Sequence, residues 1–171
     1  MPGQMDYIKA GLAQLAGSKM RARDAVRGKM GDVIMLVNGT VHKLGNTTKF
    51  EPKNKIETET LDILGKVEKE AVASSTEGSF SLEHYANSSI FQEIHQIFQD
   101  TGYWPEISLI VTVFDPRSSA GANITQYSDV VFDEVSLPAL DVTSPAMKGT
   151  VTGKYGRTQL LSPNNPIPGV W

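Results

Sequence analysis

Residues 47–60, TTKFEPKNKIETET, decide the fold because they alternate with a period of two over an unusual length. All charged side chains of this stretch fall on odd positions, and the even positions carry none. The charged positions are Lys49, Glu51, Lys53, Lys55, Glu57 and Glu59. Successive side chains of a strand point to opposite faces, so the pattern predicts one strand with a wet, charged face. At about 3.3 Å per residue this strand would span about 46 Å, although most strands have about 5–6 residues.

The residues that follow predict a long hairpin with an apolar tip. Gly65 allows a positive φ, so we expect Leu61, Asp62, Ile63, Leu64 and Gly65 to form the loop. Residues 66–84 then return as a second long strand, in which the apolar positions change from odd to even. We expect a β-bulge near residues 76–78 at this change. Tips that face solvent are usually polar, so the apolar tip indicates burial against another molecule; burial against the chain's own body is the alternative.

The flanking sequence predicts further strands and one helix. Asn38-Gly39 between the apolar runs 33–37 and 41–44 is a strong signal for a short hairpin. Residues 88–101 carry an apolar stripe at helical spacing, with a capping box of Ser89 and Gln92 and with Gly102 after the last turn. Strands are predicted over 106–114, 122–135 and 146–156. The expected fold is mainly β with one flanking helix: an antiparallel β-sandwich or half-barrel with long hairpins.

Charge divides the chain into three parts. The 171 residues carry a net charge of -3, but residues 1–31 are basic and the remainder is acidic. We expect a basic arm over 1–31, a β-sandwich domain over 32–158 and a Pro-rich tail over 159–171. The arm would contact a neighbouring subunit through its bases, unless it is simply a solvated terminus. Those bases are Lys19, Arg21, Arg23, Arg27 and Lys29.

Composition and motifs argue against an enzyme and against a metal or cofactor site. The absence of cysteine excludes disulfides, thiolate metal sites and Cys nucleophiles. His42, His84 and His95 lie on three different predicted elements without a carboxylate at ligand spacing. We therefore expect no catalytic residue, no metal and no cofactor. No apolar run approaches the roughly 20 residues that span a bilayer, so no membrane segment is expected.

Four segments in order resemble the tail tube proteins of tailed bacteriophages. The resemblance covers roughly residues 32–156 and is greatest to the family of contractile-tailed phages and phage-like bacteriocin elements of Gram-positive bacteria. The segments are HKLGNTTKFEPKNKIETETLDILGK (42–66), GSFSLEHYANSSIFQEI (78–94), TVFDPRSSAG (112–121) and SDVVFDEVSLPALDV (128–142).

This resemblance implies a structural protein of the virion tail that is assembled in the host bacterial cytoplasm. Its relatives form six-membered rings that stack into a hollow tube, in which hairpins join edge to edge around the lumen. The implied partners are further copies of the chain, the tail sheath, baseplate, tail terminator and tape measure proteins, and DNA in transient, non-specific passage. The alternatives are a tube-initiator or baseplate ring protein of the same fold, and an unrelated ligand-binding β-sandwich.

On this mapping, hairpins 47–84 and 106–135 would line the lumen and the helix would cover the outside. Residues 61–65 would make the contact between rings. Residues 49–84 contain eight acids and five bases, and the resulting net charge of -3 would repel the phosphates of passing DNA. The candidates for the lumen face are Glu51, Glu57, Glu59, Glu68 and Glu70.

Overall fold

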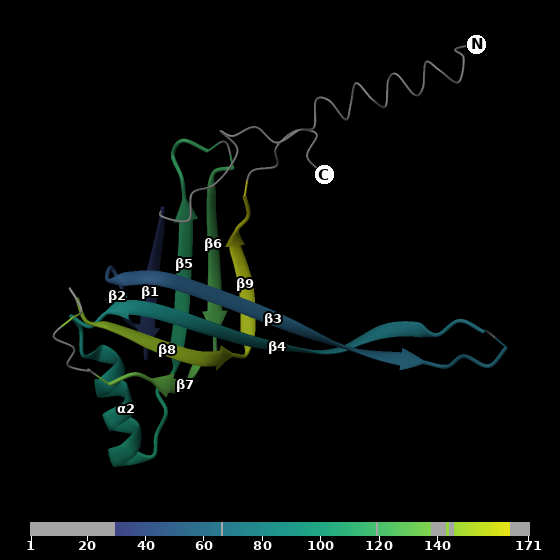
Figure 1. Cartoon of the computed structure of the whole chain (residues 1–171), viewed down its shortest axis with the longest axis horizontal. Coiled ribbons are helices and arrows are strands. Elements are labelled where there is room, and N and C mark those ends of the chain that lie inside the picture. Colours follow the sequence, from purple (N-terminus) through teal and green to yellow (C-terminus); the bar gives the residue numbers. More distant parts are fainter. Residues whose placement is uncertain (1–29, 66, 119, 138–142, 144–145, 165–171) are drawn as a thin grey trace, which may run out of the picture. The chain divides into compact units, whose positions relative to one another are not determined.

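In the part of the chain that the structure describes, two antiparallel sheets and one helix form a sandwich-like fold (Figure 1). The computed structural model describes residues 30–65, 67–118, 120–137, 143 and 146–164. Its elements are β1 (Gly31–Val37), β2 (Thr40–Lys43), β3 (Thr47–Leu61), β4 (Glu70–Tyr85), α2 (Ile90–Thr101), β5 (Ile107–Phe114), β6 (Ala122–Ser128), β7 (Val131–Val135), β8 (Lys148–Tyr155) and β9 (Arg157–Ser162). The mainly β fold with one helix is confirmed.

The strands form a five-stranded sheet of order β2-β1-β5-β6-β9 and a four-stranded sheet of order β3-β4-β8-β7. The chain divides into two compact units, one of residues 33–110 with 126–159 and one of residues 1–32 with 111–125 and 160–171. The first unit contains the four-stranded sheet and α2. Strand β9 continues past residue 158, where the sequence places the end of the domain.

The short hairpin at Asn38-Gly39 is confirmed. Asn38 has a φ of 48° and Gly39 a φ of 80°, and Val37 pairs with Thr40 across the turn. Two residues with positive φ give a turn whose twist matches that of the flanking strands, which is why this dipeptide is a reliable signal.

The core of the first unit lies on the uncharged face of the four-stranded sheet. Phe50 of β3 packs on Phe80 of β4, with ring centroids 6.0 Å apart. Phe91 of α2 lies 5.5 Å from Phe132 of β7, so the helix covers one end of the same face. Leu82 and Val151 are also fully buried there. The even apolar positions predicted for the end of residues 66–84 therefore point to the core.

The predicted strand over 122–135 is wrong, because the chain changes sheets in its middle. Strand β6 belongs to the five-stranded sheet and β7 to the four-stranded sheet. Between them Asp129 has a φ of 56°. The backbone of Val130 is held by Ile107, whose carbonyl accepts its N–H at 3.1 Å, and by Trp104, whose Nε1 donates to its carbonyl at 3.0 Å. These tertiary contacts have no local sequence signature.

Three local expectations also need correction. Strand β4 begins at Glu70 rather than at residue 66. The bulge lies at Ser74 rather than at 76–78, since Glu57 pairs with Ser75 and Thr58 with Ala73. The capping box does not form: the Ser89 hydroxyl donates to Glu93 at 2.6 Å. The predicted helix end is confirmed, with Gly102 at a φ of 67° donating its N–H to the Phe98 carbonyl.

Substitution Gly153→Ala should destabilise the fold by about 2–3 kcal/mol, because overpacking against a backbone leaves no flexible neighbour to move. The added Cβ would lie 2.3 Å from the Val131 carbonyl oxygen and 2.9 Å from the Phe80 ring. Gly45→Ala is the control, because nothing lies within 4 Å of its Cβ position. Urea unfolding should place the control within about 0.5 kcal/mol of the wild type. Equal stability of the two variants would contradict this packing.

Candidate assembly surface on the long hairpin

The β3–β4 hairpin extends beyond the sheet that carries it (Figure 1). Strand β8 pairs with β4 from Tyr85 to Gly78 and ends there. Closer to the tip, the described β4 residues 70–77 pair with β3 alone. We call residues 55–77 the projecting hairpin. A two-stranded ribbon is marginally stable in water, so this segment depends on further contacts for a fixed structure.

One face of the hairpin collects the charged residues of β3 and β4. Register places Lys55 opposite Glu77 and Glu57 opposite Ser75. The bulge at Ser74 shifts the phase of β4, so that Glu70 and Val72 lie opposite Leu61 and Glu59 on this same face. Glu51, Glu57, Glu59 and Glu70, four of the predicted lumen candidates, therefore share one surface. The fifth candidate, Glu68, lies in the loop between β3 and β4.

The opposite face of the projecting hairpin carries no charge. Ile56 pairs with Thr76, Thr58 with Ala73 and Thr60 with Ala71. Each of these side chains is exposed, including Ile56 at 59 %. The face continues the buried row of Phe80 and Leu82 out of the core. It is a core-like surface without a covering layer among the described residues.

Ion pairs order the charged face. Lys49 lies 3.0 Å from Glu51, Lys55 lies 3.7 Å from Glu57, and Lys154 of β8 reaches Glu77 at 2.6 Å. The hydrogen bond from Lys154, followed by its charge, lowers the pKa of Glu77; the same contact raises the pKa of Lys154. All these groups are exposed, and exposed pairs contribute little to stability.

Sequence reasoning missed the part that β8 plays in this face. Lys148 and Lys154 lie opposite Tyr85 and Ser79, on the side of the charged residues. The face on β3, β4 and β8 thus carries Glu51, Glu57, Glu59, Glu70, Glu77 and Glu83 against Lys49, Lys53, Lys55, Lys148 and Lys154. Of these lysines, Lys154 pairs with Glu77 of the projecting hairpin, and Glu134 of β7, opposite Thr152, adds an acid to the same side near the body. On the projecting hairpin, the acids Glu57, Glu59, Glu70 and Glu77 outnumber Lys55.

The tip is apolar and exposed. Leu61 ends β3 with 51 % of its surface accessible, Ile63 has 39 %, and Leu64 is fully accessible. Gly65 has the expected positive φ of 88°, and Lys69 pairs with Asp62 across the loop at 3.3 Å. Among the described residues, nothing of the chain's own body covers Leu64 at the tip. Val67 is also fully exposed and was missed, because the sequence placed it in a strand.

Residues 1–29 of the basic arm lie outside the described residues. They include the five predicted contact bases, Lys19, Arg21, Arg23, Arg27 and Lys29. Within the described part of the chain, no three His, Cys, Asp or Glu residues are grouped in a way that could hold a metal ion. No described helix is long and apolar enough to cross a membrane.

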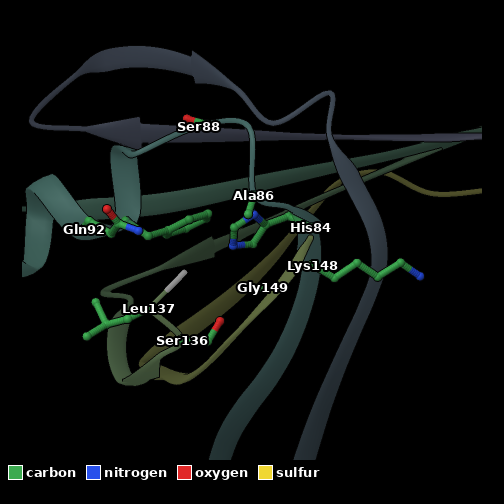
Figure 2. Close-up of a pocket in the computed structure, with 9 residues that line it drawn as sticks. His84, Ala86, Ser88, Gln92, Ser136, Leu137, Lys148 and Gly149 are labelled. Atoms are coloured by element: carbon green, nitrogen blue, oxygen red, sulfur yellow. The ribbon is translucent and has the colours of Figure 1, made fainter. Parts of the chain in front are cut away.

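An enclosed cavity beside His84 is too small for a metabolite. Its volume is about 30 Å³, whereas ligand pockets have about 300–1,000 Å³. Figure 2 shows the His84 ring beside this cavity, with Ser136 near it and Lys148 directed away. The Nδ1 of His84 lies 3.0 Å from the Tyr85 carbonyl, while its buried Nε2 has no hydrogen-bond partner among the described residues. Larger hollows of about 300–410 Å³ are open to solvent. The cavity therefore gives no support to the ligand-binding alternative.

The projecting hairpin has an exposed uncharged face and an exposed apolar tip. Together these surfaces indicate a structural protein that associates through its strands. The family of phage tail tube proteins matches residues 18–158. The chain belongs to this family, and its role is that of a structural tail tube protein. The match begins inside the basic arm, ahead of the resemblance seen from residue 32.

Solved structures of low sequence identity share the fold. A chain of the anti-feeding prophage tube-terminating cap has a TM-score of 0.63 at 11% identity, covering 84% of this chain and 95% of that one. A chain of the PVC contractile injection system sheath–tube complex has 0.58 at 12%, covering 76% and 88%. The SPP1 tail tube protein has 0.58 at 9%, covering 85% and 83%. No curated protein sequence gives a significant match.

Substitution Lys154→Met should raise the pKa of the Glu77 carboxyl towards its ordinary value, because the hydrogen bond and charge that lower it are removed. Side-chain carboxyl NMR over a pH titration measures the change. Because the pKa of Glu77 is lowered in the folded state, the pair stabilises the fold at pH values above the ordinary pKa of 4.5. This stabilisation is lost as the pH falls through the lowered pKa. The stability change should be small, since both groups are exposed. An unshifted Glu77 titration in the variant would contradict the pair.

Proposed function

We propose that this chain forms the inner tail tube of a phage or phage-like particle by stacking six-membered rings. The observation that carries the proposal is the projecting hairpin, whose uncharged face and apolar tip are exposed in one protomer. Neighbouring copies would cover that face and pair with the free edge of β3, which removes the exposed strand edge. Leu61, Asp62, Ile63, Leu64 and Gly65 would make the contact between rings.

The charged face would line a water-filled lumen through which DNA passes during ejection. Its acid excess lies on the projecting hairpin, at Glu57, Glu59 and Glu70. Lysine and arginine contacts with phosphates are what hold DNA on a protein, so an acidic wall would let it slide. Helix α2, packed on the uncharged side of the sheet, would then lie away from the lumen.

We further propose a contractile tail, in which a sheath, baseplate, tail terminator and tape measure protein are the partners and assembly takes place in the host cytoplasm. Support comes from the fold shared with the PVC sheath–tube complex and with the anti-feeding prophage cap. The fold alone also fits a tube initiator that stops after one ring. Electron microscopy of the purified chain separates the two: long uniform tubes support the proposal, and single rings favour the initiator.

Substitution Leu64→Asp should prevent tubes and leave single rings or monomers, as should Ile63→Asp. A buried, unpaired carboxylate costs several kcal/mol, so the concentration needed for assembly should rise by at least about a hundredfold. Negative-stain microscopy and sedimentation measure this. The control is Val41→Asp, which charges an apolar residue of β2 that is 63 % exposed. Long tubes of Leu64→Asp at wild-type concentrations would refute the ring contact.

Replacing Glu57, Glu59, Glu68 and Glu70 together by lysine should leave tubes intact and slow DNA ejection by about tenfold or more, because the new lysines would bind phosphates. The matched control replaces the same residues by glutamine, which removes the acids without adding bases. Ejection from purified particles, followed by dye binding to released DNA, is the measurement. Normal ejection by the lysine variant in intact particles would place these residues outside the lumen.

A further inference from the structure

The last residues of β8 contact the hairpin at the level where it leaves the sheet. Tyr155 pairs with Gly78 of β4, and Gly78 pairs with Asn54 of β3. Closer to the tip, described β4 residues have only β3 as a strand neighbour. A group that fixes the direction of the projecting hairpin must therefore act at this level.

The Tyr155 side chain reaches across β4 to β3 on the core face. Its hydroxyl directs its one proton at two neighbouring acceptors, Oδ1 of Asn54 at 2.7 Å and the carbonyl oxygen of Lys53 at 3.0 Å. The residue is 6 % exposed, and its ring meets Tyr127 edge-on at 4.8 Å. Burial raises the pKa of Tyr155, against a smaller opposing effect of a hydrogen bond with Thr158, so the hydroxyl keeps its proton at neutral pH.

Gly78 makes room for this side chain. A Cβ at Gly78 would lie 2.2 Å from Cε2 of Tyr155 and within 2.7 Å of two further ring carbons. Glycine weakens a strand interior and often marks the close approach of another group. Here the aromatic ring occupies the space that a side chain would fill, and it covers the glycine in the strand.

The opposite face of the hairpin is held at the same level by the preceding residue. Lys154 pairs with Glu77 at 2.6 Å. Both groups are about half exposed, and pairs of this kind add little to stability. The buried tyrosine is therefore the stronger of the two attachments.

We infer that Tyr155, seated on Gly78, is the positioning residue that sets the direction of the projecting hairpin. From residue 55 to residue 61 the ribbon extends about 20 Å at about 3.3 Å per residue. A rotation of about 10° at its root would move the tip by about 3.5 Å, which is close to the distance of a side-chain contact. We call the contact of Tyr155 with Gly78, Lys53 and Asn54 the clamp. The consequence for ring stacking rests on the proposed tube function, whereas the clamp itself does not.

Amide hydrogen exchange of the full chain, at concentrations below the onset of assembly, tests the clamp directly. Tyr155→Phe keeps the ring and removes the hydroxyl, so amides of residues 55–61 and 70–77 should exchange about five- to tenfold faster. Exchange in the buried part of β4 near Leu82 should be unchanged. Tyr127→Phe is the matched control, because it removes the hydroxyl of a neighbouring core tyrosine, 7 % exposed, that takes no part in the hydrogen bonds to Lys53 and Asn54. Unchanged exchange in Tyr155→Phe overturns the inference.

A double-substitution cycle provides a second test. Gly78→Ala should push the ring aside and speed exchange of the projecting hairpin. The same change in a Tyr155→Ala background meets no ring and should add no further effect. Equal effects of Gly78→Ala in both backgrounds would overturn the inference, because the glycine would then act independently of the tyrosine.

Assembly is measured separately, so that the clamp and the proposed function can fail independently. Tyr155→Phe should raise the protein concentration needed for tubes by about tenfold if one hydrogen bond is lost from each subunit. Faster exchange in Tyr155→Phe together with a wild type that forms no tubes would support the clamp and reject the tube function. Tubes of the wild type together with unchanged exchange in the variant would reject the clamp alone.

Discussion

The pairing register of β3 with β4 is the constraint on which the rest of the structure depends. A slip of one residue would move every charge to the uncharged face, because the side chains of a strand alternate with a period of two. The register is fixed in the body, where Phe50 pairs with Leu82 and Pro52 with Phe80. The bulge at Ser74 keeps the two faces distinct beyond it. Core packing thus determines surface chemistry far from the core.

This register produces a projecting hairpin that the described residues of the protomer leave exposed. Strand β3 lies at the edge of its sheet, and long exposed edges invite indiscriminate pairing. Pro52 lacks an N–H, and Lys53 and Lys55 place charge along the strand, which are features that limit such pairing. In the proposed tube, β3 would offer a free edge to a neighbouring copy, and its side chains would limit pairing to a complementary partner.

The sequence predicted the elements whose signals are local. Asn38-Gly39, the alternation over 47–60 and Gly102 each specify a backbone conformation without help from distant residues, and the structure has all three. The change of sheet at Asp129 was not predictable in this way, because Trp104 and Ile107 hold it from another part of the chain. The lysines of β8 were missed on the charged face for the same reason: strand neighbours are set by topology.

The end of β8 links the mechanics of the hairpin to its charge. Lys148 and Lys154 bring positive charge to the face only as far as Tyr155, where the strand stops. Beyond that point β3 and β4 continue without a further strand beside them among the described residues, and Glu57, Glu59 and Glu70 outnumber Lys55. The end of β8 therefore removes both the third strand that supports the hairpin and the lysines that this strand carries. In a ring of copies, the projecting hairpin would pair with a neighbouring subunit, and its acidic side chains would also repel the phosphates of passing DNA. Both effects would follow from the length of β8, because β8 ends where the projecting hairpin begins.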